Sequence, residues 1–373
     1  MKRFLLVPDS FKGTLSSKQI CNIMKDRITA HFTDSEVIEI PVADGGEGSV
    51  DCFLSATKGE RVLCASVNPF FEPIESFYGL LDGGKIAVIE MAACAGLPLV
   101  EDRKDPMKAT TYGVGILIKD AIKRGVKEII LGLGGSATND FGCGTASALG
   151  IVFYDENGKS FIPTGGTLSR VNRIERDKDL LGSIKLTLMC DVKNLLYGEK
   201  GASYVYAPQK GADSEQVKIL DEGLKHISKI AERDLGKDVS NLAGGGAAGG
   251  MAGGMAVFFN AKMKMGIDVV LDTVGFDNLL ESADMVFTGE GKIDSQSLEG
   301  KVVSGVAKRA KEKNVPVVAV VGGIDGDISP VYENGINSVF AINCLPEDFS
   351  VSRYKSEENL KKTMDNVMRI LKI

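Results

Sequence analysis

Short apolar runs alternate along the chain with glycine-rich polar loops and with segments whose apolar residues recur at helical spacing. The first two runs, 4–7 and 36–40, are each followed by a polar loop and an amphipathic segment. Near the other end, 285–287, 315–321 and 338–342 repeat this order. Strand, loop and helix in this rhythm are typical of a parallel sheet with helices on its faces. The wholly apolar run 315–321 is expected to be a buried strand.

Two predicted helices carry clear start signals. Ser16 or Ser17 is a suitable N-cap for the first helix, because a hydroxyl oxygen can accept from a free backbone N–H of the first turn. Asp213, with Gln216 three residues later, forms the capping pair of a helix predicted over 213–235. Both helices are therefore expected to be stable local elements.

The middle of the chain has a different rhythm. Alternating apolar and polar residues over 62–67 and 76–81, beside Pro69 and Pro73, predict hairpin strands in a mixed sheet. At 373 residues the chain is too long for one ordinary core. The pattern therefore indicates one discontinuous α/β domain, made from both chain ends, with a second domain inserted.

Composition narrows the class of protein. The net charge of −6 argues against a general nucleic-acid binder, because such binding depends on clustered cations. Seven cysteines without C-x-x-C spacing suit free thiols in a reducing compartment. No apolar stretch approaches the length of a membrane span, and the chain begins with a strand-like run in place of a signal peptide. A cytoplasmic protein is expected.

The glycine-rich loop over 131–144 is the first candidate for chemistry. An apolar run stops at glycine, a polar tip follows, and the next residues read as a helix N-terminus. Free amides there favour an anion, and glycines allow a phosphate to approach the backbone. A tight turn with glycines for steric reasons alone explains one such loop equally well. The chain has several similar loops, which favours the functional interpretation.

Other phosphate and nucleophile motifs are absent or weak. Residues 158–160 read Gly-Lys-Ser but lack the upstream glycine of a phosphate loop. Residues 244–249 match the dinucleotide fingerprint, but no apolar strand precedes them, so close helix packing explains them better. The two histidines, His31 and His226, are expected on helix surfaces, which disfavours a catalytic triad.

The remaining inventory is carboxylates, hydroxyls and lysines on glycine-rich loops, which suits phosphoryl transfer. Lys12 and Lys292 could neutralise a transferring phosphate. Magnesium prefers carboxylate and water ligands. The candidates for it are the loop acids Asp9, Asp44, Glu47, Asp191, Glu290 and Asp294. Each acid taken alone is more simply a cap or turn residue.

Taken in order, these loops resemble the bacterial glycerate kinases. The matching blocks are residues 8–13, 43–48, 134–140, 190–192, 209–212, 246–250 and 288–291, followed by Ile293, Asp294 and Gln296. The resemblance covers essentially the whole chain. It implies a flavodoxin-like parallel-sheet domain over 1–60 and 282–373, an inserted α/β mixed-sheet domain over 61–281, and an active site in the cleft between them. It also implies ATP and Mg²⁺, with (R)-glycerate phosphorylated at the 2-hydroxyl.

On this resemblance we assign roles as hypotheses. Asp191 is expected to be the base that takes the hydroxyl proton, with Asp44 second, and Lys12 to hold the acceptor's carboxylate, with Arg103 a poorer candidate. Glu290 and Asp294 are the expected metal ligands. The expected substrate- and phosphate-binding residues are Asp9, Ser10, Gly45, Gly46, Glu47, Gly134, Gly135, Ser136, Thr138, Asn139, Asp140, Gly289, Glu290, Gly291, Lys292 and Asp294. The first loops, 9–12 and 44–48, are expected on the acceptor and metal side, and 134–140 and 288–294 at the phosphates.

Three alternatives stay open at this point. One is a glycerate kinase that forms 3-phosphoglycerate. Another is an NAD-dependent dehydrogenase, which would require a strand ending just before Gly244. The last is a non-catalytic protein that binds a small acid. The chain is expected to be a monomer or homodimer, without nucleic-acid or membrane partners.

Overall fold

The computed structural model describes residues 1–43, 45–176, 181–294, 302–343, 345 and 347–373. It divides into two compact units. Unit 1 comprises Met1–Ala43, Ser55–Thr57 and Ile267–Ile373, and unit 2 comprises Asp44–Leu54 and Lys58–Gly266. Asp44 and Gln296, both named above, lie outside the described residues.

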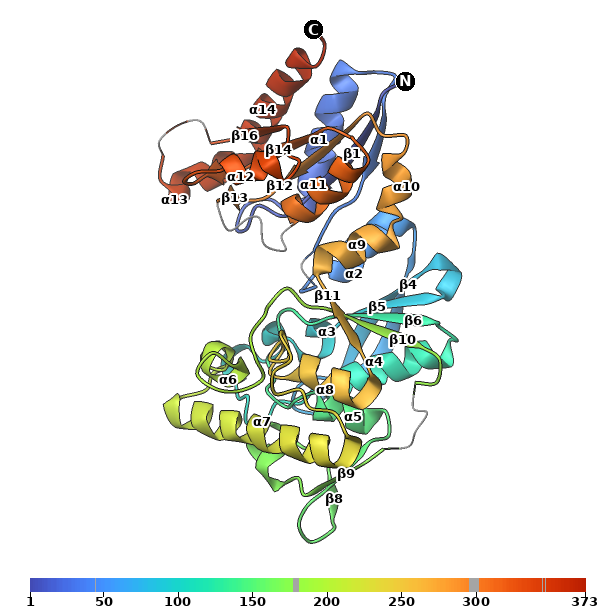
Figure 1. Cartoon of the computed structure of the whole chain (residues 1–373), viewed down its shortest axis with the longest axis vertical. Coiled ribbons are helices and arrows are strands. Elements are labelled where there is room, and N and C mark those ends of the chain that lie inside the picture. Colours follow the sequence, from blue (N-terminus) through green and yellow to red (C-terminus); the bar gives the residue numbers. More distant parts are fainter. Residues whose placement is uncertain (44, 177–180, 295–301, 344, 346) are drawn as a thin grey trace. The chain divides into compact units, whose positions relative to one another are not determined.

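Unit 1 is built on a parallel five-stranded sheet in the order β2-β1-β12-β14-β16 (Figure 1). This is the flavodoxin-like order, in which the strand sequence reverses direction beside β1. The strands of unit 1 as a whole are β1 (Arg3–Pro8), β2 (Glu36–Glu39), β12 (Met285–Gly289), β13 (Lys292–Ile293), β14 (Val317–Val321), β15 (Gly323–Ile324) and β16 (Ser338–Ala341). Its helices are α1 (Ser17–His31), α9 (Gly266–Thr273), α10 (Phe276–Leu280), α11 (Val302–Glu312), α12 (Ser329–Glu333), α13 (Phe349–Ser352), η7 (Arg353–Lys355) and α14 (Ser356–Ile370).

The sheet of unit 1 is covered on both faces. Phe4, Phe287 and Val320 pack in one cluster with buried residues of α1 and α14, which lie side by side (Figure 1). Side chains alternate across a strand, so the intervening residues face the other side, where α11 contacts β1, β12 and β14. Every residue of β14 is buried, as the apolar run 315–321 predicts.

Unit 2 contains a six-stranded mixed sheet in the order β11-β10-β6-β5-β4-β3. β3, β4 and β5 pair antiparallel, and β5, β6, β10 and β11 pair parallel. The strands of unit 2 as a whole are β3 (Glu60–Val67), β4 (Pro73–Leu81), β5 (Ile86–Glu90), β6 (Glu128–Gly132), β7 (Val152–Tyr154), β8 (Ser160–Phe161), β9 (Arg173–Glu175), β10 (Lys185–Met189) and β11 (Lys262–Lys264). The helices are α2 (Ser49–Thr57), η1 (Asp82–Gly84), α3 (Ala92–Ala95), η2 (Leu97–Leu99), η3 (Glu101–Arg103), α4 (Tyr112–Lys123), α5 (Cys143–Ala148), η4 (Gly165–Arg170), α6 (Ala202–Tyr206), η5 (Pro208–Lys210), α7 (Ser214–Leu235) and α8 (Met251–Phe259).

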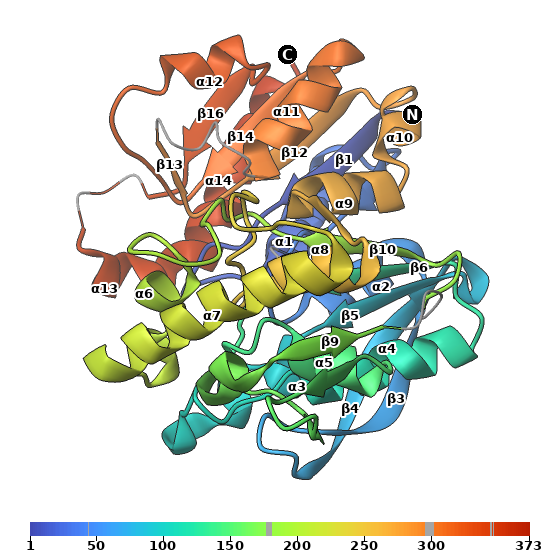
Figure 2. The same cartoon turned by 60° about the horizontal axis from the view of Figure 1, so that its bottom comes forward.

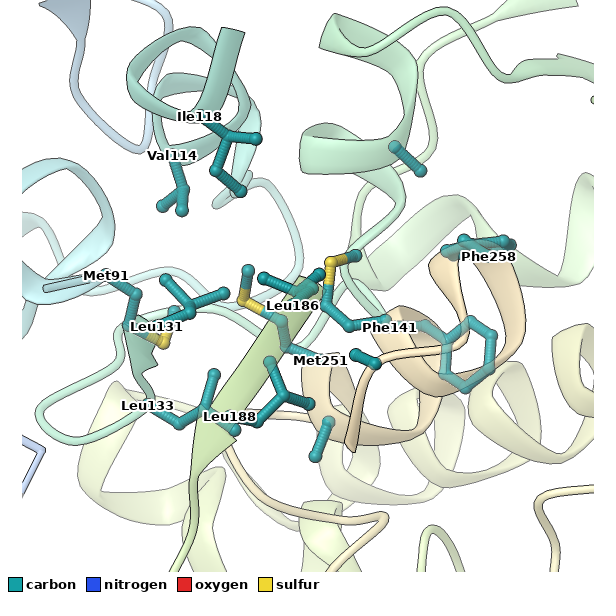
Figure 3. Packing of buried hydrophobic residues seen from close by; sticks show 14 of the residues in the cluster. Met91, Val114, Ile118, Leu131, Leu133, Phe141, Leu186, Leu188, Met251 and Phe258 are labelled. Atoms are coloured by element: carbon teal, nitrogen blue, oxygen red, sulfur yellow. The ribbon is translucent and has the colours of Figure 1, made fainter. Parts of the chain in front are cut away.

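The core of unit 2 joins this sheet to its helices. Figure 3 shows Val114 and Ile118 of α4, Leu131 of β6 and Leu186 and Leu188 of β10 within one cluster of buried side chains. In Figures 1 and 2, α7 lies beside α6 and α8, as the contacts between these elements require. The mixed sheet predicted from the alternating segments is therefore present, and the flavodoxin-like and mixed-sheet fold class is confirmed.

The units divide the chain at different residues from the predicted boundaries at 60/61 and 281/282. Residues 267–281 belong to unit 1, because Arg309 of α11 bonds the carboxylates of Asp268 and Asp272 at 3.3 and 2.8 Å. Residues 45–54 belong to unit 2, where Val50 donates its backbone N–H to Glu90. The predicted domain boundaries, which differ from these limits of the compact units, stay predictions.

The predicted helix starts are observed. Ser16 is the N-cap of α1 and forms a capping box with Gln19. Asp213 caps α7 and accepts from the backbone N–H of Glu215 and Gln216 at 3.0 and 2.9 Å. Among the described residues, no helix is long and apolar enough to cross a bilayer.

Candidate active site

In unit 1, the loops that follow β1 and β12 meet at the switch point of the sheet. Asp9 follows β1 and donates its backbone N–H to the carbonyl oxygen of Gly289 at 2.8 Å. Gly322, which follows β14, donates to the carbonyl oxygen of Glu290 at 3.0 Å. Open α/β sheets bind ligands at the carboxyl ends of the strands beside such a switch point. These loops therefore occupy the expected ligand-binding position of unit 1.

Two glycines allow this close approach. A Cβ on Gly289 would overlap the carbonyl oxygen of Val320, and one on Gly322 would overlap the carbonyl oxygen of Gly291. In both cases the obstacle is backbone, which cannot move aside as the end of a side chain can. Glycine is therefore required for the packing of these loops against one another.

The predicted polar residues of unit 1 lie on these loops in different environments. Lys12 is exposed, whereas Glu290 is only 6% exposed. Lys292 forms an ion pair with Asp325 at 2.5 Å, and both side chains are largely exposed. Ser10 donates its backbone N–H to the carboxylate of Asp9 at 2.6 Å. The structure thus brings together Asp9, Ser10 and Lys12 with Gly289, Glu290, Gly291, Lys292 and Asp294 on the loops at one edge of the sheet.

The acids at this edge suit a magnesium ion that is bound mainly by substrate phosphates. Glu290 and Asp294 follow β12 and β13, and Asp9 follows β1. Within the described part of the chain, no three His, Cys, Asp or Glu side chains are grouped closely enough to hold a metal by themselves. Magnesium in phosphoryl-transfer sites typically takes only one or two protein carboxylates together with phosphate oxygens and water. The donor set present here is compatible with that arrangement.

In unit 2, the loop around Gly45 lies against the loop that follows β6. Gly134 donates its backbone N–H to the carbonyl oxygen of Gly45 at 3.0 Å. A Cβ on Gly132 would overlap that same oxygen, and one on Gly134 would overlap the backbone of Gly46. Gly45, Gly46, Glu47, Gly134 and Gly135 therefore belong to one packed pair of loops, with Glu47 exposed.

Glu90 holds the second half of this loop in place. It is the last residue of β5, 2% exposed, and accepts from the backbone N–H of Gly48 at 3.2 Å and of Val50 at 2.6 Å. Burial raises the pKa of Glu90, and the two backbone hydrogen bonds oppose that rise. Its carboxylate therefore occupies the free amides at the N-terminus of α2.

Asp140 plays the same part at α5. Its carboxylate is fully buried and accepts from Thr111 N–H and O–H at 2.8 and 2.9 Å and from Gly142 and Gly144 N–H at 3.1 and 3.2 Å. Burial raises the pKa of Asp140, and these hydrogen bonds oppose the rise. The amides of Cys143 and Thr145 donate to Asp140 O and to Thr111 Oγ1. The anion that the sequence predicts at this N-terminus is therefore the protein's own Asp140.

The tip of the same loop contacts a buried lysine. Lys210, at the end of η5 and 2% exposed, donates to Ser136 Oγ at 2.8 Å and to the carbonyl oxygen of Thr138 at 2.6 Å. Asn139 donates from Nδ2 to Ser203 Oγ at 3.2 Å. Burial lowers the pKa of Lys210 to about 7, against the opposing influence of Asp140. Ser136, Thr138 and Asn139 thus share one polar cluster with a cation.

Asp191 lies two residues after β10 and is exposed. Its Oδ1 accepts from the backbone N–H of Gly266 at 2.7 Å. The bond fixes the orientation of one carboxylate oxygen at the carboxyl end of the sheet of unit 2. Asp191 therefore combines a defined orientation with access from solvent.

The glycine run over 244–250 serves packing. In the described part of the chain, no strand ends immediately before Gly244. A turn precedes this residue, and α7 lies before the turn. A Cβ on Gly246 would overlap the carbonyl oxygen of Leu195, and one on Gly249 would overlap that of Thr138. The first-turn amides of α8 donate to carbonyls of the run itself. The strand that the dehydrogenase interpretation requires is absent there, and that alternative is wrong.

Within each unit, loops from both predicted sides lie together, and the division into an acceptor side and a phosphate side stays a prediction. Residues 9–12 lie with 288–294 in unit 1, and 45–48 lie with 134–140 in unit 2. The sequence-based site list also omitted Glu90 and Lys210, which hold the loops of unit 2. Lys210 falls inside the matching block 209–212, which was the available signal for it. Nothing in the strand sequence distinguished Glu90.

Fold and loops together define a two-unit α/β protein with glycine-rich loops at the carboxyl ends of parallel strands, where sheets of this class bind ligands. The profile of the glycerate kinase family matches residues 4–372. The chain belongs to the glycerate kinase family, which confirms the resemblance carried by its loop blocks.

Individual relatives agree over the full length. Glycerate kinase of Haemophilus influenzae is 42% identical over 372 residues, covering 99% of this chain and 98% of the relative. Glycerate 2-kinase of Escherichia coli is 38% identical over 347 residues, covering 91% and 90%. A crystal structure assigned as glycerate kinase 2 from Salmonella typhimurium LT2 is similar with a TM-score of 0.87 at 38% identity, covering 100% and 98%.

Proposed function

We propose that this member of the glycerate kinase family transfers the γ-phosphoryl group of ATP to the 2-hydroxyl of (R)-glycerate, giving 2-phospho-(R)-glycerate and ADP. The observation that carries the proposal is the meeting of the loops after β1 and β12 at the switch point of unit 1. Family membership and the name of the Escherichia coli relative support the acceptor and the 2-position.

The reaction needs a base, a cation near the acceptor and charge stabilisation for the phosphates. We assign the base to Asp191, which takes the proton of the 2-hydroxyl as that oxygen bonds to the γ-phosphorus and the bond to ADP breaks. Lys12 is assigned to the carboxylate of glycerate, and Lys292 to the phosphates. Glu290 and Asp294 would hold Mg²⁺, which neutralises phosphate charge when bound.

Several further statements about the protein remain predictions. The active site in a cleft between the two domains, Asp44 as the second candidate base, and a monomeric or dimeric state stay predictions. So does the cytoplasmic location, to which the free thiols of the described cysteines are suited.

The decisive experiment measures ADP release by the purified protein with ATP and Mg²⁺, with and without (R)-glycerate. We expect release that depends on glycerate, and a phosphorus NMR spectrum of the product that matches 2-phosphoglycerate. A 3-phosphoglycerate spectrum would replace the proposed position by the 3-hydroxyl. Binding of glycerate without ADP release would instead favour the non-catalytic alternative.

Asp191→Asn tests the base. Removing a general base typically lowers turnover about 100-fold or more, so we expect kcat to fall by that order with little change in the KM values. Asp238→Asn is the matched control, because Asp238 is an exposed acid of the same unit that accepts from Ser240 N–H at 2.8 Å. A near-normal kcat for the Asp191 variant would remove Asp191 from this role.

A further inference from the structure

The polar cluster at the tip of the loop after β6 is the most unusual group of buried side chains in unit 2. Its members are Ser136, Thr138, Asn139 and Lys210. Lys210 reaches the loop from η5, more than 70 residues further along the chain. Lysine is rarely buried completely unless it is paired, and here Lys210 donates to a hydroxyl and to a carbonyl oxygen of the loop. The ammonium group of Lys210 therefore lies directly against the loop.

The direction of the hydrogen bond defines what Ser136 can do. A lysine ammonium carries three hydrogens and no acceptor, so Oγ of Ser136 must accept from it. The hydroxyl hydrogen of Ser136 is then left for another acceptor, and none is found for it among the described residues. Ser136 is 8% exposed, whereas Thr138 and Asn139 are 0% exposed. Ser136 is thus the point at which an incoming ligand reaches the cluster.

A second observation also indicates a ligand. Thr138 Oγ1 and Asn139 Oδ1 are buried and have no hydrogen-bond partner within the described part of the chain. Buried polar atoms are nearly always paired, so two adjacent exceptions need an explanation. An oxygen of a bound group could accept from Thr138 Oγ1, and a hydroxyl of that group could donate to Asn139 Oδ1.

We propose that Lys210 is a positioning residue that turns the hydroxyl of Ser136 toward an anionic oxygen of the bound substrate. The inference rests on the proposed function and extends it to one residue outside the predicted site. Phosphate and carboxylate oxygens only accept hydrogen bonds, and both occur in the proposed substrates. The oxygen therefore belongs either to a phosphate of ATP or to the carboxylate of glycerate.

The two hydrogen bonds of Lys210 explain how it positions the hydroxyl of Ser136. Lys210 bonds Ser136 and the carbonyl of Thr138 together, so the ammonium fixes both the rotamer of the hydroxyl and the backbone that carries it. Gly249 packs closely against the same carbonyl, because a Cβ on Gly249 would overlap the carbonyl oxygen of Thr138. Loss of the ammonium would free the Ser136 hydroxyl to turn inward and would remove the hydrogen bond from Lys210 to the Thr138 carbonyl.

The test is a double-mutant cycle with Lys210→Met and Ser136→Ala. Each single variant is expected to raise KM for one substrate, the same one in both, by about tenfold, as loss of a hydrogen bond to a charged group does. A rise for ATP identifies the oxygen as phosphate, and a rise for glycerate identifies it as carboxylate. The double variant should be no worse than the more affected single variant, because both changes remove one interaction.

Two variants control for general damage. Lys237→Met removes a half-buried lysine of the same unit that donates to a backbone carbonyl at 2.6 Å, and Ser228→Ala removes a buried hydroxyl that donates only within α7. Neither residue touches the loop. Thermal unfolding of every variant separates lost stability from altered substrate affinity.

Unchanged KM values for both substrates in Ser136→Ala would overturn the inference, and this variant keeps the test valid even if Lys210→Met does not fold. Effects of the two single changes that multiply in the double variant would also overturn it, because Lys210 would then act independently of Ser136. A wild-type protein that releases no ADP with glycerate would defeat the proposed function instead, which is a separate result.

Discussion

Helix α1 of unit 1 begins in a different way from α2 and α5 of unit 2. At α1 an exposed local pair, the N-cap Ser16 and Gln19 of the first turn, forms the cap. Helices α2 and α5 begin with αL glycines that offer no side chain, and the buried carboxylates of Glu90 and Asp140 accept from their amides. Glu90 is 40 residues away from the amide of Val50. A glycine-rich loop before a helix can therefore bind an anion that the protein supplies itself.

This difference sets how much each group contributes to stability. An exposed cap exchanges a bond to water for a bond to protein, so its loss is modest. A buried carboxylate that accepts several N–H groups leaves all of those donors unpaired when it is removed. Helices α2 and α5 should therefore depend far more strongly on Glu90 and Asp140 than α1 does on Ser16.

The largest expected effect is that of Asp140→Ala. It removes the acceptor for four hydrogen bonds in a fully buried site, so we expect a loss of about 3 kcal/mol or more in the free energy of unfolding. Ser16→Ala in unit 1 should lose only about 1 kcal/mol. Urea unfolding measures both. Equal losses for the two variants would abolish the distinction between the buried and the exposed cap.

Glu90→Gln should have the next largest effect. The glutamine keeps the size and one carbonyl oxygen, but its amide group opposes the backbone N–H of either Gly48 or Val50. We expect a loss of about 2 kcal/mol in the free energy of unfolding. Glu75→Gln, on the exposed part of β4, is the control and should change it by less than about 0.5 kcal/mol. If both variants unfold at the same urea concentration, Glu90 does not cap α2 in solution.

Because of Lys210, which lies in unit 2, we expect the free energy of unfolding to depend on pH. Its pKa of about 7 in the folded protein lies below its ordinary value of 10.5, so the unfolded chain binds more protons between these two values. Stability should therefore rise with pH across that window, by about 1 kcal/mol per pH unit, relative to Lys210→Met. Urea unfolding of both proteins at several pH values gives the difference directly. A difference that stays constant from about pH 7 to about pH 10 would show that Lys210 keeps an ordinary pKa.

The smallest effect on stability is expected for Lys292→Met in unit 1. The ion pair with Asp325 is exposed on both sides, and such pairs contribute little. The unfolding midpoint should stay unchanged within error, whereas KM for ATP should rise if Lys292 meets the phosphates. Lys85→Met, which removes the exposed pair with Asp82 in unit 2, is the control for both readouts. A large loss of stability would mean that this surface pair matters to the fold.

Local patterning predicted the elements well where the signal is local. Hydrophobic periodicity and caps placed α1, α7 and the buried strand β14, because each depends on residues within a few positions of one another. The order of loop blocks also identified the family. Loops far apart in the sequence lie together inside each unit, 9–12 with 288–294 and 45–48 with 134–140.

The sequence by itself thus determined the strand–loop–helix rhythm, the mixed sheet in the middle of the chain and the family. Only the tertiary structure decided which loops lie together, and that Asp140 fills the helix N-terminus that resembles a phosphate site. It alone revealed Glu90 and Lys210 as supports of those loops. The physical reason is that each of these groups also needs a partner far away in the sequence, such as Thr111 for Asp140 and Val50 for Glu90, which no local pattern encodes.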